Sequence, residues 1–273
     1  MKRIAIFALF CLSVIGCESD LGFVPPDPDL FVVRGYLFTG EPVTEFTVTS
    51  VLSIDADSTE TVAPISDAQI TLIKAGVRYD LVPTTGEPGR YHYPGSDLTV
   101  EVGDFFQMEA THAGTTATAE TVVPAPPLGL ELSADSLIAP EGGIGGPGRG
   151  GQGALQNRVV ARWANPGGEL HYVVVDNMEV DPVILPTTEI FSRFAPRIIQ
   201  QPTASDSAFV AVLTLTHFGN HRLRLYRIND EYADLYEGLE QDSRDLNEPP
   251  TNIRGGLGVF AAFSADSAFF EVR

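Results

Sequence analysis

The sequence contains very little cysteine and very little lysine. Its 273 residues include two cysteines, Cys11 and Cys17, and two lysines, Lys2 and Lys74. Cys11 lies in an N-terminal segment that we expect to be removed, so the remaining chain has one thiol and forms no internal disulfide. The stability of the fold must therefore come from packing.

Positive charge is scarce as well. Lys and Arg together number 17 against 36 Asp and Glu, which gives a formal net charge of −19, and loss of Lys2 and Arg3 would make it −21. A surface of this charge repels phosphate backbones and anionic headgroups, which argues against nucleic-acid binding. Two interpretations of the acidity stay open: a compositional or salt-adapted surface, or an acidic face that recruits cations or a basic partner.

Long apolar runs are missing except near the N-terminus. Lys2 and Arg3 precede an apolar stretch at 4–15, which is too short to span a bilayer as a helix but has the length of a signal-peptide core. Gly16 and Cys17 follow, a pattern similar to the bacterial lipobox, in which the chain is cut before an acylated cysteine. We therefore predict residues 1–16 as a lipoprotein signal peptide and Cys17 as the site of lipid attachment.

The segment that begins at Cys17 indicates a tether and the membrane to which the protein is anchored. Residues 17–29 are acidic and contain three prolines, which indicates a lipidated tether. In the sorting rule of enteric bacteria, Asp after the lipidated cysteine retains a lipoprotein in the inner membrane, and here Glu18 follows instead. We therefore expect the protein in the outer membrane. Its lipid anchor should hold firmly, since each buried methylene contributes about 0.8 kcal/mol. Whether the protein faces the cell surface or the periplasm stays open.

Residues 30–124 have the pattern of an N-terminal β-sandwich of the immunoglobulin or transthyretin type. Branched and aromatic residues gather in short segments that are separated by Gly- and Pro-containing turns. The Ala75-Gly76 step marks the clearest hairpin. The expected strands are 30–38, 45–53, 68–74, 78–82, 90–93, 105–112 and 116–123.

A Pro- and Gly-rich segment at 125–156 is expected to be a linker. Its extreme part, 142–153, has eight glycines among twelve residues. A phosphate-binding glycine loop follows a strand and precedes a helix, and this segment is not expected to do either. We therefore interpret it as a flexible connection.

Residues 157–273 are expected to form a second β-sandwich, similar to fibronectin type III. Strands are predicted at 159–163 and 171–175, followed by an antiparallel pair at 208–217 and 222–228. A helix near 230–241 has an apolar stripe and is capped by Asn229 or Asp230. The last two strands, 257–263 and 268–272, are expected to be separated by a Ser-Ala-Asp turn. The fold class is thus mainly β, with one α-helix in the C-terminal region.

Residues that could carry chemistry are scattered. His217 and His221 flank a turn and lack further ligands for zinc, and Asp55 and Asp57 lack the glycine and the closing Glu of a calcium loop. No nucleophile motif is present, so a hydrolase is disfavoured and no catalytic, cofactor or metal residue is predicted. Five aromatic residues could form a carbohydrate platform, although strand aromatics are more typical of a core: Tyr36, Tyr91, Tyr93, Trp163 and Tyr172.

The C-terminal third resembles one family of bacterial lipoproteins. Members carry Y-x-x-L-x-x-L-x-x-Q, an acidic Pro-containing loop and N-I-x-N-G-L-G-I-F-G-G-Y, to which residues 232–241, 247–250 and 252–263 are similar. Gly255 stands in place of Asn, and Ala261-Ala262-Phe263 in place of Gly-Gly-Tyr. Residues 64–72 also match the strand P-V-x-D-A-x-V-x-L. The family is catalogued as domain of unknown function 4249.

The resemblance implies a role that the residues alone do not. Members are lipoproteins of Gram-negative bacteria, often encoded beside TonB-dependent receptors, which implies a non-enzymatic accessory of such a receptor in nutrient uptake. A stand-alone adhesin or glycan-binding module is the alternative, and the ligand is unknown. We interpret Gly255, Gly256 and Gly258 as packing residues that allow positive φ or close backbone approach.

Overall fold

The computed structural model describes residues 30–51, 61–139, 157–185, 197–229, 232–233 and 251–273. The predicted signal peptide, Cys17, the tether, the segment 142–153, Asp55 and Asp57 lie outside these residues. What is described is mainly β, as the sequence predicts. In this part of the chain no helix is both long and apolar enough to cross a membrane.

The N-terminal lobe contains seven strands close to the predicted positions. Buried residues alternate with more exposed ones along the first and the last of them, as expected for strands with one face on a core. They are hydrogen-bonded in the order β1-β2-β5-β4-β3-β6-β7. The strands are β1 (Phe31–Phe38), β2 (Glu45–Ser50), β3 (Gln69–Lys74), β4 (Val77–Pro83), β5 (Arg90–His92), β6 (Phe105–His112) and β7 (Thr115–Val122).

The predicted hairpin at Ala75-Gly76 is confirmed. Both residues have positive φ, 49° and 80°, and β3 pairs antiparallel with β4 around them. Such a turn matches the right-handed twist of the flanking strands, so a two-residue connection suffices.

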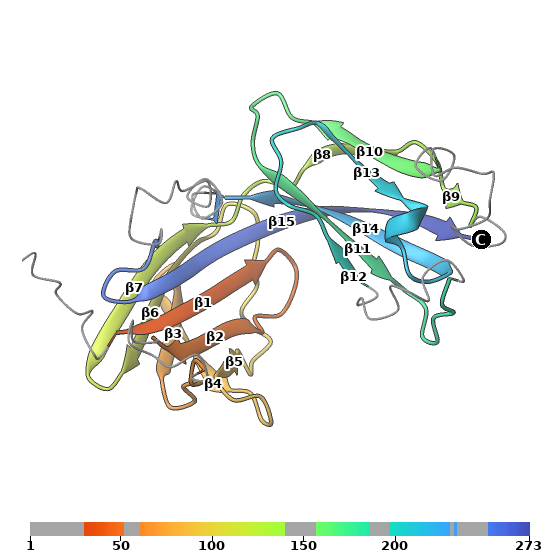
Figure 1. Cartoon of the computed structure of the whole chain (residues 1–273). Coiled ribbons are helices and arrows are strands. Elements are labelled where there is room, and N and C mark those ends of the chain that lie inside the picture. Colours follow the sequence, from red (N-terminus) through yellow and green to blue (C-terminus); the bar gives the residue numbers. More distant parts are fainter. Residues whose placement is uncertain (1–29, 52–60, 140–156, 186–196, 230–231, 234–250) are drawn as a thin grey trace, which may run out of the picture.

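The last strand, β15 (Leu257–Val272), runs through both lobes (Figure 1). Its first half pairs in parallel with β1, and its second half pairs antiparallel with β14 (Gly219–Ile228). Phe263 is the residue at which both partners are present. A single sheet path therefore extends from β12 at one end to β7 at the other.

The predicted turn between two final strands is wrong. Ser264 and Asp266 continue the ladder opposite Arg227 and Leu225 of β14. The Ser264 hydroxyl is buried and donates to the Pro124 carbonyl over 2.6 Å. Because this polar side chain finds a partner inside the protein, the strand passes through residues that locally resemble a turn.

The C-terminal lobe has two packed layers. β11 (His171–Asn177) and β12 (Arg197–Ile199) join β14 and β15 in one layer, and β13 (Ser207–Ala211), β10 (Arg158–Ala164) and β8 (Leu128–Leu132) form the other. The predicted pairing of 208–217 with 222–228 is wrong, because β13 pairs with β10 and β14 pairs with β11 and β15. The chain leaves β13 through a 3₁₀ turn at Val212–Thr214, which directs it back into the core.

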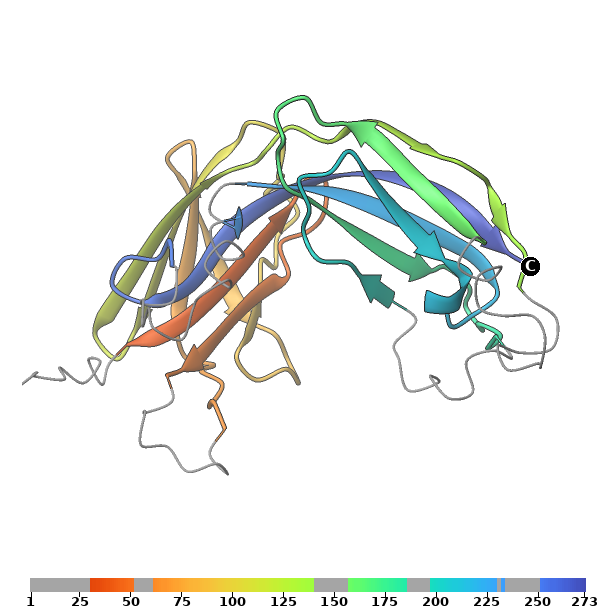
Figure 2. The same cartoon turned by 45° about the horizontal axis from the view of Figure 1, so that its top comes forward.

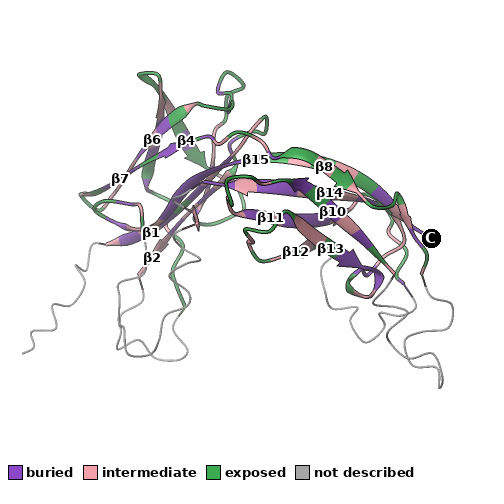
Figure 3. Ribbon diagram, turned by 90° about the horizontal axis from the view of Figure 1, so that it is seen from above, coloured by how far each residue is buried: buried purple, intermediate pink, exposed green. Residues whose placement is uncertain are grey.

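Part of the segment expected to be a linker is structured. β8 and β9 (Ser136–Leu137) lie within 125–156, and β9 pairs in parallel with the end of β15. Leu130, Leu132 and Leu137 pack in the core of the C-terminal lobe. The outer face of β8 is largely exposed (Figure 3). The high proline and glycine content of 125–156 favoured a linker, and three leucines were too weak a signal to predict strands there.

Alternate residues of β15 serve different cores. Phe260 and Ala262 belong to the core of the N-terminal lobe, whereas Val259, Ala261 and Phe263 belong to a third cluster on the opposite face of the strand. The second half of β15 contributes to the core between the two C-terminal layers. Figure 2 shows the two lobes lying on either side of the point where β15 passes between them. The hydrophobic clusters of both lobes therefore share β15, and the linker expected at 125–156 does not separate them.

The predicted role of the C-terminal glycines is confirmed. Gly258 has φ +112°, and a Cβ on it would lie 1.9 Å from the Val33 carbonyl oxygen. Gly255 has φ +75°, and a Cβ on it would lie 2.5 Å from the Thr116 carbonyl oxygen. The segment that leads into β15 thus packs backbone against backbone.

The helix expected near 230–241 is not confirmed. Of its residues only Tyr232 and Ala233 are described, and the rest lie outside the described residues. The Tyr232 N–H donates to the Asn229 side chain over 3.3 Å, the contact expected of the predicted N-cap.

Candidate functional site

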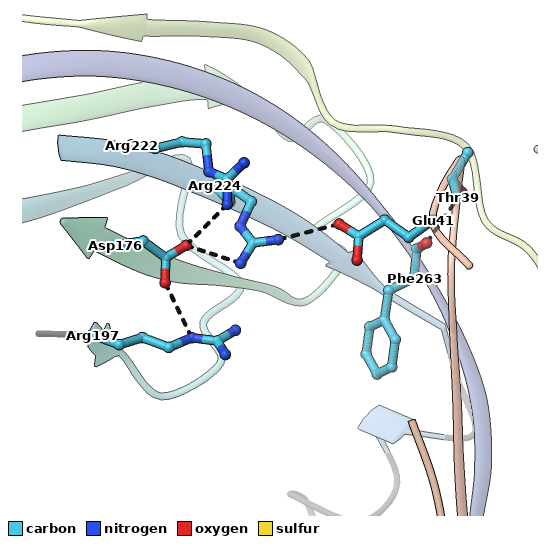
Figure 4. Close-up of polar contacts among 7 residues, drawn as sticks. All are labelled: Thr39, Glu41, Asp176, Arg197, Arg222, Arg224 and Phe263. Carbon is cyan, nitrogen blue, oxygen red and sulfur yellow. Dashed lines mark hydrogen bonds and ion pairs between the residues drawn. The ribbon is translucent and has the colours of Figure 1, made fainter. Parts of the chain in front are cut away.

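A row of charged side chains crosses the C-terminal lobe on the face that points away from its core. Arg197 of β12 lies opposite Asp176 of β11, Asp176 lies opposite Arg222 of β14, and Arg222 lies opposite Phe269 of β15. Residues directly opposite each other on neighbouring strands project to the same side of a sheet. The four side chains therefore form one row, of which Figure 4 shows the charged members.

The neighbouring row adds a third arginine. Arg224 follows Arg222 by two residues, so both project to the same face. It lies between Val174 of β11 and Ser267 of β15. We call Arg197, Arg222 and Arg224 the arginine cluster.

Asp176 is the centre of the arginine cluster. Its Oδ1 lies 3.3 Å from Arg197 Nε, and its Oδ2 lies 2.9 Å from Arg224 Nη2 and 3.5 Å from Arg222 Nη2. The side chains of Asp176 and Arg224 are only 16% and 13% exposed. One partly buried carboxylate thus faces three guanidinium groups, two of them on one strand.

A second carboxylate reaches the cluster from the N-terminal lobe. Glu41, in the connection after β1, accepts a hydrogen bond from Arg224 Nη1 over 3.2 Å. Next to it, the Thr39 N–H donates to the Phe263 carbonyl over 3.0 Å, which fixes this connection against β15 (Figure 4). Arg224 therefore joins acidic groups from both lobes.

Aromatic rings support the cluster from one side. The Arg224 guanidinium lies 5.3 Å from the ring centroid of Tyr226, and Tyr226 stacks on Tyr172 with centroids 4.8 Å apart. A cation over an aromatic face is held by the ring quadrupole. The head group of Arg224 is consequently fixed by a ring as well as by two carboxylates.

The electrostatics of the cluster favour charge on Arg224. Burial acts to lower the pKa of Arg224, but Tyr226, Asp176 and Glu41 raise it further, so the pKa lies above its ordinary value. The three guanidinium groups face two carboxylates, which leaves one unit of positive charge. Such an arrangement is suited to holding an anionic group.

The histidines that the sequence singled out do not assemble into a site. His221 is buried, with Nδ1 3.0 Å from the Gly219 carbonyl and Nε2 3.3 Å from Asn177 Nδ2. His217 Nδ1 lies 2.7 Å from Thr216 Oγ1. In the described part of the chain, no three His, Cys, Asp or Glu side chains are grouped to hold a metal ion.

The five candidate aromatic residues are spread over three clusters. Tyr91 and Tyr93 pack in the N-terminal core, and Trp163 packs between the C-terminal layers. Tyr36 and Tyr172 belong to the third cluster, around Phe263. They do not form one platform, and the expectation that strand aromatics fill cores is confirmed for Tyr91 and Trp163, which are buried.

A shallow hollow of about 260 Å³ lies on the N-terminal lobe. Polar side chains line it, among them Gln107, Glu109, Glu120 and Arg254. Of the positions that the sequence singled out, it contains only Asn252 and Arg254, which belong to the family motif at 252–263.

The sequence carries a local signal for the arginine cluster. Alternation along a strand puts Tyr172, Val174 and Asp176 on one face, and the register of β11 agrees with this. The alternation of Arg222 and Arg224 with leucines also indicates a charged strand face. The pairing of β11 with β14 could not be predicted, because the two strands are far apart in the sequence.

Comparison with known families gives one match. The profile of a family described as Domain of unknown function (DUF4249) matches residues 20–268. The chain belongs to the DUF4249 family. The match covers both lobes and most of β15, so a DUF4249 unit includes the strand that joins the two lobes. A search of curated proteins gives no match.

Proposed function

We propose that this DUF4249 protein is a lipoprotein anchored in the outer membrane through acylated Cys17, and that it serves a TonB-dependent receptor as a non-enzymatic accessory in nutrient uptake. The observation that carries this proposal is the leader-like segment 1–16 followed directly by Cys17, which precedes a family match over nearly all of the remaining chain. The receptor partnership rests on the genetic neighbourhood that the family resemblance implies.

The architecture supports a binding role. β-Sandwich domains of the immunoglobulin, transthyretin or fibronectin type III type commonly bind partners through their loops and sheet faces, although a fold alone does not define a function. Here β15 pairs with strands of both lobes, and Arg224 is bound to Glu41 across them. Such a body on a proline-containing tether would present one fixed surface to a membrane partner.

The anchor is tested by fractionation of Cys17→Ser, with Ser19→Ala as the matched control. The Cys17→Ser protein should be released from the membrane fraction, because a leader without its cysteine leaves no site for acylation. The control protein should stay with the outer membrane. Retention of Cys17→Ser would contradict the anchor.

The partnership is tested by a mild-detergent pull-down from native outer membranes with a C-terminal tag. A stoichiometric TonB-dependent receptor, together with loss of uptake in a deletion strain, would support the proposal. A clean monomer and normal uptake of every substrate would overturn it. Binding to a glycan array would then favour the alternative, a stand-alone surface adhesin or glycan-binding module.

A further inference from the structure

We propose that the arginine cluster is a binding site for a monocarboxylate that carries an apolar group. This site is independent of the receptor partnership. It is formed by Arg197, Arg222 and Arg224 around Asp176, on the face of the C-terminal lobe shown in Figure 4.

The first observation is that the cluster has donors to spare. A guanidinium carries five N–H groups. Arg222 reaches Asp176 only over 3.5 Å, and the side chains of Arg222 and Arg197 are 32% and 51% exposed. Guanidinium N–H groups that face solvent can donate to the acceptor oxygens of a ligand.

The second observation is the charge. Asp176 and Glu41 together balance two of the three guanidinium groups. One singly charged carboxylate completes the balance, whereas a phosphate monoester of nearly two negative charges exceeds it. The net charge of −19 of the whole chain further disfavours polyanions.

The third observation is the surroundings of the open arginines. Phe269, opposite Arg222, is 62% exposed, and Ile199, two residues after Arg197, is 63% exposed. Both project to the face of the cluster, because Ile199 is two residues from Arg197 on one strand and Phe269 is paired with Arg222 on the next. The charged centre is thus flanked by two accessible apolar side chains, which suit a ligand with an apolar part next to its carboxylate.

The fourth observation is that the cluster is held in place before any ligand binds. Asp176 restrains the three arginines, and Tyr226 lies beside the Arg224 guanidinium. A site that is already ordered loses less conformational entropy on binding.

The test is calorimetric titration of the full mature chain with hexanoate and with hexanamide. Hexanoate should bind saturably, and hexanamide at least about tenfold more weakly, because it lacks the charge-assisted hydrogen bonds. Arg222→Gln should weaken hexanoate binding by about tenfold, and Arg222→Lys by less, because Lys keeps the charge but loses the planar fork. Arg158→Gln is the matched control, since Arg158 stacks on Phe209 in the other layer.

The source of the carboxylate is distinguished by a second pair of probes. N-acetyl-Leu-Leu-Phe and its C-terminal amide test a peptide terminus, and hexanoate tests a free organic acid. Tighter binding of either acid than of its amide, with loss in Arg222→Gln, supports the site and identifies the source. Equal binding of acid and amide, tighter binding of inorganic phosphate, or no effect of Arg222→Gln in a variant with unchanged thermal unfolding overturns it.

Discussion

Phe263 stacks on Phe38 with ring centroids 5.2 Å apart, at the residue where β15 passes from β1 to β14 as its partner. Around this pair lie Tyr36, Tyr226 and Tyr232. The third hydrophobic cluster is therefore centred on the position at which the two lobes meet along one strand, so packing and backbone pairing link the lobes at the same place.

Phe263→Ala should destabilise the protein by about 4 kcal/mol, the usual cost of removing a buried aromatic ring. The side chain is buried, and urea unfolding monitored by tyrosine fluorescence measures the loss. Phe269→Ala is the matched control on the same strand, and we expect a change of about 0.5 kcal/mol or less because Phe269 is exposed. Equal effects of the two substitutions would refute a central role for Phe263.

Gly258→Ala should cost about 3 kcal/mol or more, enough to abolish soluble expression of a marginally stable domain. The new Cβ would collide with the Val33 carbonyl, and φ is +112°. Gly103→Ala is the control, with φ +84° but open space, and its cost should be about 1 kcal/mol from backbone strain alone. Thermal unfolding of both variants measures the difference, and similar melting temperatures would contradict the close approach.

Asp176→Asn should destabilise the protein by about 2 kcal/mol, since its carboxylate is partly buried between three guanidinium groups. Removing the central carboxylate leaves three neighbouring guanidinium groups facing one another, and breaking a buried pair costs about 3 kcal/mol or more before allowance for partial exposure. Glu87→Gln, which breaks an exposed pair with Arg90, should cost about 0.5 kcal/mol or less. Guanidinium chloride would screen the effect, so urea is the denaturant to use. A loss in Asp176→Asn no larger than in Glu87→Gln would show that the cluster contributes no stability.

Stability should fall as the pH drops below about 6.5. Burial lowers the pKa of both His221 and His171 below the ordinary value of 6.5. For His221, the neighbouring His217 acts in the same direction, while the Gly219 carbonyl and Glu179 oppose it. Between the lowered and the ordinary pKa, the unfolded chain binds more protons than the folded protein, so acid favours unfolding.

The measurement is the free energy of unfolding in urea between about pH 7.5 and pH 5.5, in wild type, His221→Gln and His171→Gln. Each substitution should make the slope with pH shallower. The Gly219 carbonyl can only accept, so His221 Nδ1 carries the proton and Nε2 accepts from Asn177. A second proton on Nε2 would break that bond. An unchanged slope in both variants would show that the buried histidines do not control the pH dependence.

Local features of the fold could be predicted from the sequence because they depend on neighbouring residues. Branched and aromatic segments between turn residues predicted β1 and β6, and the glycine of the Ala75-Gly76 step predicted the β3–β4 hairpin. Strand pairing could not be predicted in the same way. The partner of Val33 is Gly258, far along the chain, and neither residue carries a local sign of the other. The resemblance to a DUF4249 sequence identified the family, but it carries no strand register.

The same distinction holds for the candidate site. Strand alternation puts Asp176 on the face of Tyr172 and Val174, but its three cationic partners come from β12 and β14. Ser264 and Asp266 were misassigned to a turn because their polarity is local, whereas the acceptor for Ser264, the Pro124 carbonyl, is 140 residues away. Polar residues within a strand become recognisable only once their distant partners are known.

The parallel pairing of β1 with β15 sets an order of events during biosynthesis. A chain made from its N-terminus exposes one edge of β1, with Phe31 and Val33 beside it, until residues 257–263 have been added. Loop closure over more than two hundred residues is slow, and an unpaired strand edge invites pairing with other chains. The N-terminal lobe therefore remains incomplete until almost the entire chain is available, and a nascent or truncated chain needs protection from aggregation that the finished fold does not.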